Sequence, residues 1–388
     1  MDFTFASAGQ IIFGPGTVRQ VAGHAAALGR KVLVVTGGNP ERAARLLRDL
    51  NEANIHSTRF QAAAEPDVET VETGARLARE AGCDLIIGMG GGSVMDTAKA
   101  IAALATNRLP IYDYLEVVGK ALPFQHPPAP CIAVPTTAGT GSEVTRNAVI
   151  RSRRHRIKVS LRSPGMLPAF AVVDPELTLD LPPAVTAATG FDALCQLLEA
   201  YVSNRANPLT DSLCREGLIR CARSLRTVFS DGHNLEARTD MALASLFSGL
   251  ALANAGLGAV HGVAGPFGGL RSAPHGAVCA RLLPVITAAN ITQLQHDPAA
   301  VATMERYTEI ARILTGDPAA TAQNGVQWLQ AAVGSLKIPP LGRWGLSSEE
   351  VPALADQAMK SSSMRGNPVV LNRQALEDAI RQALVAEN

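Results

Sequence analysis

The sequence has few aromatic residues, almost no net charge and no paired cysteine motif. Tryptophan, tyrosine and phenylalanine together make up 4% of the 388 residues, which argues against a base-stacking platform for single-stranded nucleic acid. Lysine and arginine number 35 against 34 acidic residues, so the formal charge is +1. No global charge therefore favours nucleic acid or an anionic membrane surface, and we expect neither as a partner.

The cysteines and the N-terminus indicate a reducing compartment. The six cysteines are scattered and form no CxxC pair, which in a chain of this length is typical of buried thiols. The first residues, MDFTFASAGQIIFG, lack the basic segment and apolar core of a secretory signal. We therefore expect a cytoplasmic protein.

One segment is long and apolar enough to be tested as a membrane span. Residues 241–270 contain no Asp, Glu, Lys or Arg, and such a run can cross a bilayer. The run also contains serines, an asparagine, a histidine, many glycines and a proline. We expect a central helix of a large core that leads into a site, with a membrane span as the alternative.

The length and the order of segments indicate two domains. Short apolar runs at residues 31–35, 84–88, 131–134 and 171–173 alternate with helix-like segments, which predicts a mainly parallel sheet covered on both faces. Beyond residue 174 the periodicity is helical, over residues 184–202, 210–229, 235–253, 299–314 and 319–336. We predict an α/β domain over residues 1–181 and an all-α domain over residues 182–388.

Two loops with glycines follow predicted strands. GMGGGSVMD, at residues 88–96, precedes a helix whose N–H groups could face a phosphate. It departs from the GxGxxG fingerprint at Ser93, and a tight strand-to-helix turn is the alternative. PTTAGTGSE, at residues 135–143, offers hydroxyl groups that suit a pyrophosphate or ribose. Two such loops at consecutive strand ends predict a nucleotide bound to the α/β domain.

A third loop bears on the choice of cofactor. Many dinucleotide folds place an acid after a strand to bind the ribose 2′-hydroxyl, but the positions here are Gly37, Gly38 and Asn39. No carboxylate would repel a 2′-phosphate, and Arg42 and Arg45 follow about one turn later. We infer that NADP is tolerated or preferred, and two solvated arginines without a role are the alternative.

Residues typical of metal ligands lie in the helical half. Asp192 and Gln196 are four apart and share one face of an otherwise apolar helix. His261 is expected at the end of the uncharged helix, and His275 in the loop-like segment SAPHG. Asp192 and the two histidines would suit Fe²⁺ or Zn²⁺ with an open position. Spacing alone does not show that the three meet.

Five segments, in order, resemble the iron-containing (group III) alcohol dehydrogenase family. They are GGGSVMDTAKAIA (90–102), PTTAGTGSEVT (135–145), VVDPELTLDLP (172–182), GFDALCQLLEAYVS (190–203) and VHGVAGPFGGLRSAPHGAV (260–278). The resemblance implies a dehydroquinate synthase-like architecture, with a Rossmann-like dinucleotide-binding domain and a helical domain for metal and substrate. It also implies metal-assisted hydride exchange between NAD or NADP and a small alcohol or its carbonyl product. Relatives are often dimers or larger, so we expect a homo-oligomer by analogy.

The resemblance assigns roles to particular residues. The family's metal carboxylate matches Asp192 and two of its metal histidines match His261 and His275, while the remaining metal histidine falls on Gln196, a weaker neutral donor. The family's NAD-selecting aspartate falls on Gly37. The matching cofactor positions are Gly91, Gly92, Ser93, Thr136, Thr137 and Thr140, with Asn147 and Lys158 on the nicotinamide side.

Two further departures concern the substrate, and three alternatives stay open. Gly265 stands where many relatives carry a histidine, so a water chain or the ribose hydroxyls must be considered for proton delivery. Arg271 replaces an aromatic residue and would suit an acidic substrate, unless it is an ordinary surface arginine. The alternatives are a metal-independent reductase of maleylacetate-like oxo acids, a lyase resembling dehydroquinate synthase, and a non-catalytic nucleotide-binding protein.

Overall fold

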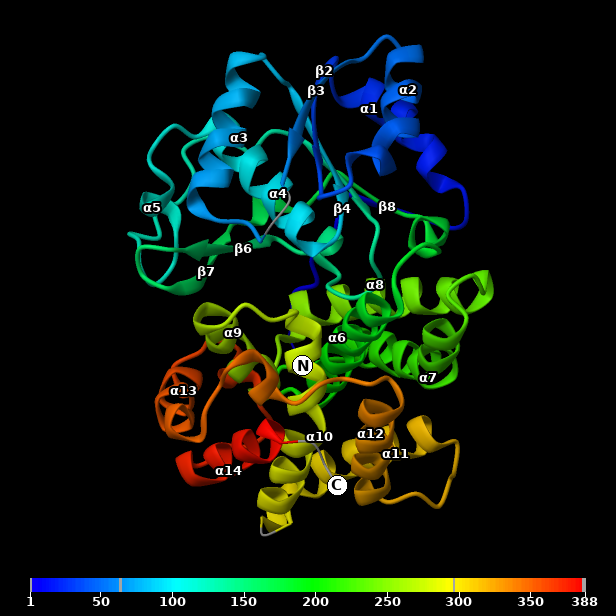
Figure 1. The fold of residues 1–388 in the computed structure, drawn as a ribbon, viewed down its shortest axis with the longest axis vertical. Helices are drawn as coiled ribbons and strands as arrows, with labels where there is room; N and C mark the ends of the chain where they lie inside the picture. Colours follow the sequence, from blue (N-terminus) through cyan, green and yellow to red (C-terminus); the bar gives the residue numbers. More distant parts are fainter. Residues whose placement is uncertain (1, 63–64, 296, 386–388) are drawn as a thin grey trace. The chain divides into compact units, whose positions relative to one another are not determined.

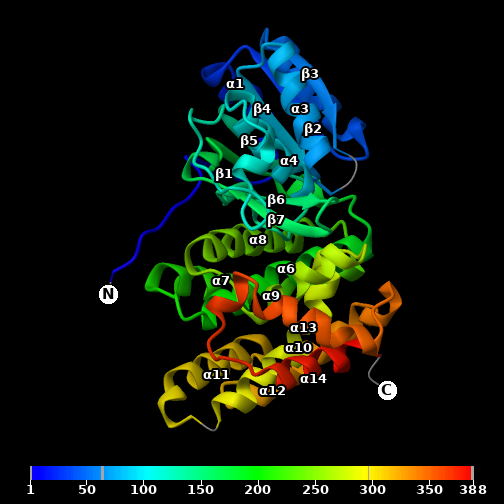
Figure 2. The ribbon, with the colours of Figure 1, turned by 90° about the vertical axis from the view of Figure 1, so that its left-hand side faces the viewer.

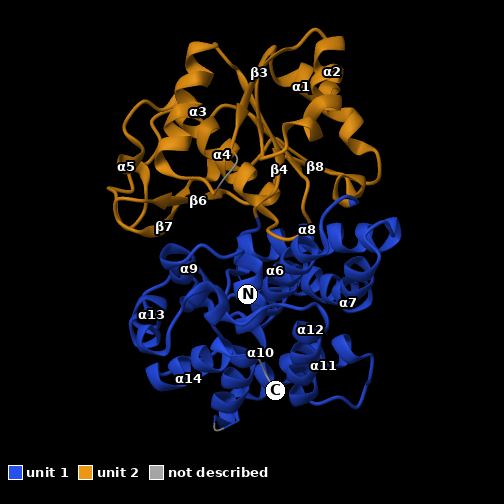
Figure 3. Ribbon diagram, in the orientation of Figure 1, with its two compact units in different colours: residues 1–5, 179–388 blue, residues 6–178 orange. Residues whose placement is uncertain are grey.

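The computed structural model describes residues 2–62, 65–295 and 297–385. The chain divides into two compact units (Figure 3), one of residues 6–178 and the other of residues 179–388 together with residues 1–5. The division follows Thr178, within the DPELTLDLPP segment in which the sequence places the domain boundary.

The α/β unit is built on a six-stranded parallel sheet. Its strands, in spatial order, are β1 (Gln10–Phe13), β8 (Phe170–Val173), β5 (Cys131–Pro135), β4 (Leu85–Gly90), β2 (Lys31–Thr36) and β3 (His56–Gln61). The prediction of a mainly parallel sheet is confirmed. The edge strands β1 and β3 were not predicted. The β3 sequence HSTRFQ is polar and partly exposed, whereas β1 contains the short apolar run Ile11–Phe13 and could have been found.

Alternate side chains of the central strands enter two different cores, since successive residues of a strand point to opposite faces. Val32 and Val34 pack with α1 (Val21–Leu28) and α2 (Ala44–Glu52). Leu33 and Val35 pack with α3 (Val68–Glu80) and α4 (Gly92–Thr106). Figure 1 shows the two helix pairs on opposite faces of the sheet. This double cover explains why the buried strands are apolar throughout.

An antiparallel hairpin that the sequence reading missed lies between β5 and β8 in the chain. β6 (Asn147–Ser152) pairs with β7 (Ile157–Arg162), and the two run side by side in Figure 2. Its apolar residues pack on α3, α4 and the short α5 (Ile111–Tyr114). One face of the hairpin is buried. On the other face lie Arg151, Lys158 and Arg162, and these residues together with the basic turn at 153–156 make the segment resemble a polar loop.

The described part of the second unit contains helices and no strand, as predicted. The helices are α6 (Pro183–Val202), α7 (Pro208–Ser230), α8 (Leu235–Ala255), α9 (Ala259–Leu270), α10 (His275–Leu294), α11 (Val301–Thr315), α12 (Ala322–Ser335), α13 (Val351–Met359) and α14 (Arg373–Leu384). α6 is buried along nearly its whole length and contacts α7, α8 and α10.

The uncharged run at residues 241–270 is not one helix, and the sequence prediction was wrong here. The chain turns at Gly256, whose φ of 75° favours glycine, and α8 and α9 meet at a bend of 98°. Within the described residues, α10 is the one single helix that is long and apolar enough to span a membrane. The bent α8–α9 pair also qualifies if it is counted as one span. α10 is 72% buried over its apolar window, and its contacts with α6, α9, α12 and α14 account for its composition.

The first turn of α10 lies closer to α6 than a side chain at residue 276 would allow. A Cβ on Gly276 would overlap the carbonyl oxygen of Ala188 and lie 3.1 Å from the Cβ of Asp192. The glycine therefore lets the first turn of α10, with His275, pack against the turn of α6 that carries Asp192.

We predict that Gly276→Ala destabilises the protein by about 1–3 kcal/mol, because the added methyl forces α10 away from α6. The control is Gly265→Ala, where a Cβ would meet no atom within 4 Å, and which should leave stability unchanged or slightly higher. Urea unfolding followed by circular dichroism measures both. Equal midpoints for the two variants would contradict the close approach of α10 and α6.

Candidate metal centre and cofactor loops

The three predicted cofactor loops emerge side by side at the carboxyl edge of the sheet. They follow β2, β4 and β5, and Thr36 pairs with Met89 while Gly90 pairs with Pro135. The chain passes from β2 to β3 on one side and then returns to β4 on the other. The point where the strand order reverses, at the carboxyl ends of the strands, is the usual ligand position in open α/β sheets.

Most glycines around β4 have a packing role of their own. A Cβ on Gly88 or Gly90 would come within 2.7 Å of an α4 side chain, so these two glycines allow α4 to pack on β4. A Cβ on Gly92 would lie 2.6 Å from Thr140, so Gly92 allows the two loops to meet. The number of glycines thus supports phosphate binding less than expected. The N-terminus of α4 supports it better, because no described side chain caps it at Gly91.

Asp96 and Lys99 of α4 hold the second loop in place. Asp96 Oδ1 accepts a hydrogen bond of 2.5 Å from Ser142 Oγ. Lys99 is buried, and its Nζ donates to the carbonyl oxygens of Ser142 (2.9 Å) and Asn147 (2.5 Å) and to Thr145 Oγ1 (2.8 Å). Neither charged residue was singled out from the sequence. Their spacing of three on an otherwise apolar helix was the available signal.

The remaining loop residues differ in how far they are available to a ligand. Thr137 and Thr140 are partly exposed, whereas Thr136 is buried. Ser93 lies in the first turn of α4 and is partly exposed. Asn39 is exposed and its side chain accepts from the backbone N–H of Glu41 at 3.2 Å. The loops thus present hydroxyl and backbone groups in the expected place.

The structure does not bring Asn147 and Lys158 together. In the hairpin Asn147 pairs with Arg162, whereas Lys158 pairs with Arg151. The two pairs are four residues apart along the strands, roughly 13 Å at the rise of a β-strand. Lys158 Nζ also forms a 2.6 Å ion pair with Glu65.

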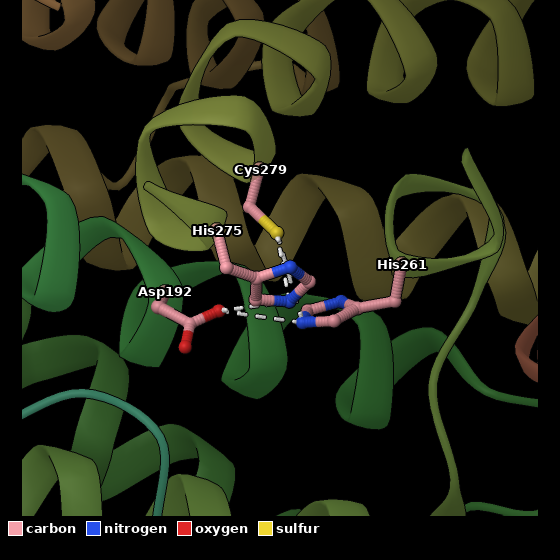
Figure 4. A group of neighbouring side chains, drawn as sticks. All are labelled: Asp192, His261, His275 and Cys279. Carbon is pink, nitrogen blue, oxygen red and sulfur yellow. Dashed lines mark hydrogen bonds and ion pairs between the residues drawn. The ribbon is translucent and has the colours of Figure 1, made fainter. Parts of the chain in front are cut away.

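Asp192 of α6, His261 of α9 and His275 of α10 point toward one another, and Cys279 of α10 joins them (Figure 4). Asp192 Oδ1 lies 3.4 Å from His261 Nε2 and 3.9 Å from His275 Nε2. This oxygen is buried and accepts no hydrogen bond from the described residues. An acceptor buried without a partner is costly unless a cation binds it, so the set fits a divalent metal.

The two histidines start helices, which the sequence reading did not expect. His261 lies in the first turn of α9 rather than at the end of a long helix, and His275 is the first residue of α10 rather than part of a loop. The side chain of His275 is 37% exposed, so the cluster stays accessible to a small molecule.

Glu199 fixes the orientation of His261. Glu199 is buried, and its Oε2 lies 2.6 Å from Nδ1 of His261. Its Oε1 accepts a hydrogen bond of 2.6 Å from the backbone N–H of Val260. A carboxylate only accepts, so the proton sits on Nδ1 and Nε2 turns its lone pair to Asp192. Sequence reasoning missed Glu199, although it follows Asp192 by seven residues on the same apolar helix face.

The sulfur atoms of Cys279 and Cys195 flank His261. Cys279 Sγ lies 3.8 Å from Nε2, on the side of Asp192, and Cys195 Sγ lies 3.8 Å from Nδ1, on the side of Glu199. Burial alone would lower the pKa of His261, but the Cys279 sulfur and the Glu199 carboxylate raise it above the ordinary value. A cation must displace the proton that these groups attract, so its binding weakens as the pH falls.

The sequence matches two family descriptions that together cover most of the chain. Residues 8–175 match the iron-containing alcohol dehydrogenase description, and residues 186–384 match the C-terminal part of the same family. The chain belongs to the iron-containing alcohol dehydrogenase family. It is accordingly an oxidoreductase of alcohols and their carbonyl products, and the alternatives are not favoured.

Relatives from this family align over almost the whole chain. The 1,3-propanediol dehydrogenase of Citrobacter freundii is 35% identical over 393 residues, covering 96% of each chain. The crystal structure of a 1,3-propanediol oxidoreductase has a TM-score of 0.91 at 33% identity, covering 99% of this chain and 100% of that one. Sulfoacetaldehyde reductase from Bifidobacterium kashiwanohense, solved with NAD⁺, has a TM-score of 0.88 at 27% identity, covering 100% of both.

Three residues singled out in the sequence as departures, at positions 196, 265 and 271, have defined surroundings. Gln196 is buried, and its Oε1 accepts a 2.7 Å hydrogen bond from Ser248 Oγ. Gly265 has open space where a side chain would begin. Arg271 donates to Glu350 at 2.5 Å and to the carbonyl of residue 345 at 3.1 Å. These contacts give Arg271 a structural role and weaken the case for an acidic substrate.

Glu143 is a buried acid of the second cofactor loop. Burial raises its pKa from an ordinary value of 4.5 to about 7, although the charge of Lys99 opposes the change. The folded protein then holds a proton that the unfolded chain releases, so the stability of the fold falls as the pH rises through this range.

We predict that Glu143→Gln removes the loss of folding stability that Glu143 causes as the pH rises. Between pH 5 and pH 8 the variant should gain roughly 2.5 kcal/mol relative to the unmodified protein, because the Glu143 pKa of about 7 lies well above its ordinary value of 4.5. Urea unfolding of both proteins at the two pH values measures the difference. Parallel pH dependences would contradict a neutral Glu143 in the folded state.

Proposed function

We propose that this chain is an NAD-dependent, metal-assisted alcohol dehydrogenase whose cation is held by Asp192, His261 and His275. The convergence of these three side chains from three helices, with a buried oxygen that lacks a partner, supports the proposal most strongly. Iron suits a member of this family, and two imidazoles with a carboxylate also suit Zn²⁺.

A divalent cation held by Asp192, His261 and His275 would supply Lewis-acid chemistry at the substrate carbonyl. The protein's own residues prepare the site for it. Glu199 holds the proton of His261 on Nδ1, which leaves Nε2 free as a donor atom. The short contact between α6 and α10 at Gly276 holds Asp192 beside His275. Three rigid helices therefore fix the donor atoms before any ligand arrives.

The loops after β2, β4 and β5 are the proposed site of the dinucleotide. The uncapped N-terminus of α4 suits the pyrophosphate, and the partly exposed Thr137 and Thr140 offer hydroxyl groups. The NAD⁺ complex of the sulfoacetaldehyde reductase supports NAD as a cofactor. We extend the proposal to NADP, because no carboxylate stands at residues 37–39. The hydride chemistry belongs to the cofactor.

The proposed substrates are small uncharged alcohols and their aldehydes or ketones. The 1,3-propanediol dehydrogenase relatives support this size class. The pairing of Arg271 with Glu350 leaves no evident cation for an acidic substrate at that position. A homo-oligomer and a cytoplasmic location stay predictions.

We predict that His261→Ala no longer binds the metal and that its turnover falls more than about 100-fold. The reason is that several kcal/mol of Lewis-acid stabilisation of the transition state are lost. The Kd for NADH, measured by fluorescence titration, should change less than about twofold, because the substitution leaves the cofactor loops unchanged. Metal content by mass spectrometry and initial rates measure the effect. His233→Ala, at an exposed position of the same unit, is the control. Normal turnover in His261→Ala would refute the metal role.

We predict that Gly37→Asp lowers kcat/KM for NADPH by about tenfold or more through charge repulsion, with little change for NADH. The side chain has room, since a Cβ would lie 3.5 Å from its nearest neighbour. Gly37→Asn, of equal size and without charge, is the matched control. Initial rates with both cofactors decide the matter. An unmodified protein inactive with NADPH, or an aspartate variant that uses it normally, would contradict the prediction.

A further inference from the structure

We propose that Cys279 is a fourth protein ligand of the metal in this chain, in place of the imidazole that the resemblance implies at residue 196. The inference rests on the proposed function, in which Asp192, His261 and His275 hold a divalent cation. It adds a sulfur to that set and thereby changes the class of metal that the chain prefers.

Four of the six distances among the donor atoms lie within about 0.5 Å of the edges of a tetrahedral site. Bonds to Zn²⁺ of typical length put N and O about 3.4 Å apart and N and S about 3.6 Å apart. Cys279 Sγ lies 3.6 Å from Nε2 of His275 and 3.8 Å from Nε2 of His261. Asp192 Oδ1 lies 3.4 Å and 3.9 Å from Nε2 of His261 and His275 respectively. All four atoms lie within 4.8 Å of one another.

The backbone fixes Cys279 in this place. It follows His275 by four residues on α10, so both side chains project from one helix face. Its side chain is fully buried, which keeps the sulfur against the imidazoles rather than in solvent. Cys195, the other nearby thiol, contacts Nδ1 of His261 and lies on the side of Glu199. Of the two thiols, Cys279 is therefore the one placed to share a cation with Nε2.

Gln196 is poorly placed to supply the missing donor. Its Oε1 already accepts a 2.7 Å hydrogen bond from Ser248 of α8. An amide oxygen is also a weak neutral donor beside a thiolate. The sulfur would thus restore the four protein ligands that the resemblance implies.

A thiolate in the set changes metal preference. Soft sulfur donors favour Zn²⁺, while an all-imidazole and carboxylate set is less selective. The thiol loses its proton to solvent when the metal binds. We therefore expect this chain to retain Zn²⁺ more strongly than Fe²⁺.

Cobalt substitution tests the sulfur ligand without measuring activity. The purified full-length protein is stripped of metal and reconstituted with Co²⁺, whose visible d–d bands report occupancy and whose near-ultraviolet thiolate-to-cobalt band reports sulfur. We expect both in the unmodified protein. Cys279→Ser should keep the d–d bands, lose the charge-transfer band and bind Zn²⁺ at least about tenfold more weakly. Cys195→Ser, the matched control, should keep the charge-transfer band.

The outcomes separate the two proposals. An unmodified protein with d–d bands and no charge-transfer band would overturn the Cys279 ligand and leave the proposed function intact, as would a band that persists in Cys279→Ser. Failure of the unmodified protein to bind Co²⁺, Fe²⁺ or Zn²⁺ would overturn the metal site itself. Cys279→Ala gives the same reading if the serine variant does not fold.

Discussion

The hydrogen bond between Glu199 and Nδ1 of His261 is the constraint on which the proposed metal centre depends. It puts the imidazole proton on the side away from Asp192 and leaves a lone pair facing the buried, unpartnered carboxylate oxygen. A Cβ on Gly258, at the start of α9, would lie 2.9 Å from Glu199 Oε1. The glycine therefore leaves room for the Glu199 carboxylate beside the first turn of α9. The bend between α8 and α9 thus serves the same contact, since it presents the first turn of α9 to α6.

The fold was largely predictable from the sequence where burial is complete. The central strands have apolar runs and α6 to α8 have helical periodicity, so their type and order were correct. The β6–β7 hairpin and the edge strand β3 were missed because polar, partly exposed residues interrupt their apolar pattern. The edge strand β1 was missed although it contains three consecutive apolar residues. The uncharged run was misread as one helix because its interruption lies in the backbone of Gly256, which composition does not reveal.

The site was predictable only in part, for a different reason. Histidines and a carboxylate in apolar segments signal a candidate centre, and a family resemblance supplies their order. Glu199 and Cys279 each share a helix face with a predicted metal ligand, but they were missed because that spacing does not show which side chains meet. Their roles follow from which helix packs against which, and tertiary structure alone determines that. The glycines near β4 were overread, since packing on α4 explains two of them.

The central claim is that side chains of α6, α9 and α10 hold one cation. Anomalous diffraction from crystals of the metal-loaded protein, recorded on both sides of the metal absorption edge, tests it directly. The account predicts one strong peak within bonding distance of Asp192 Oδ1 and of Nε2 of His261 and His275. A peak at other residues, with these three side chains unliganded, would contradict it.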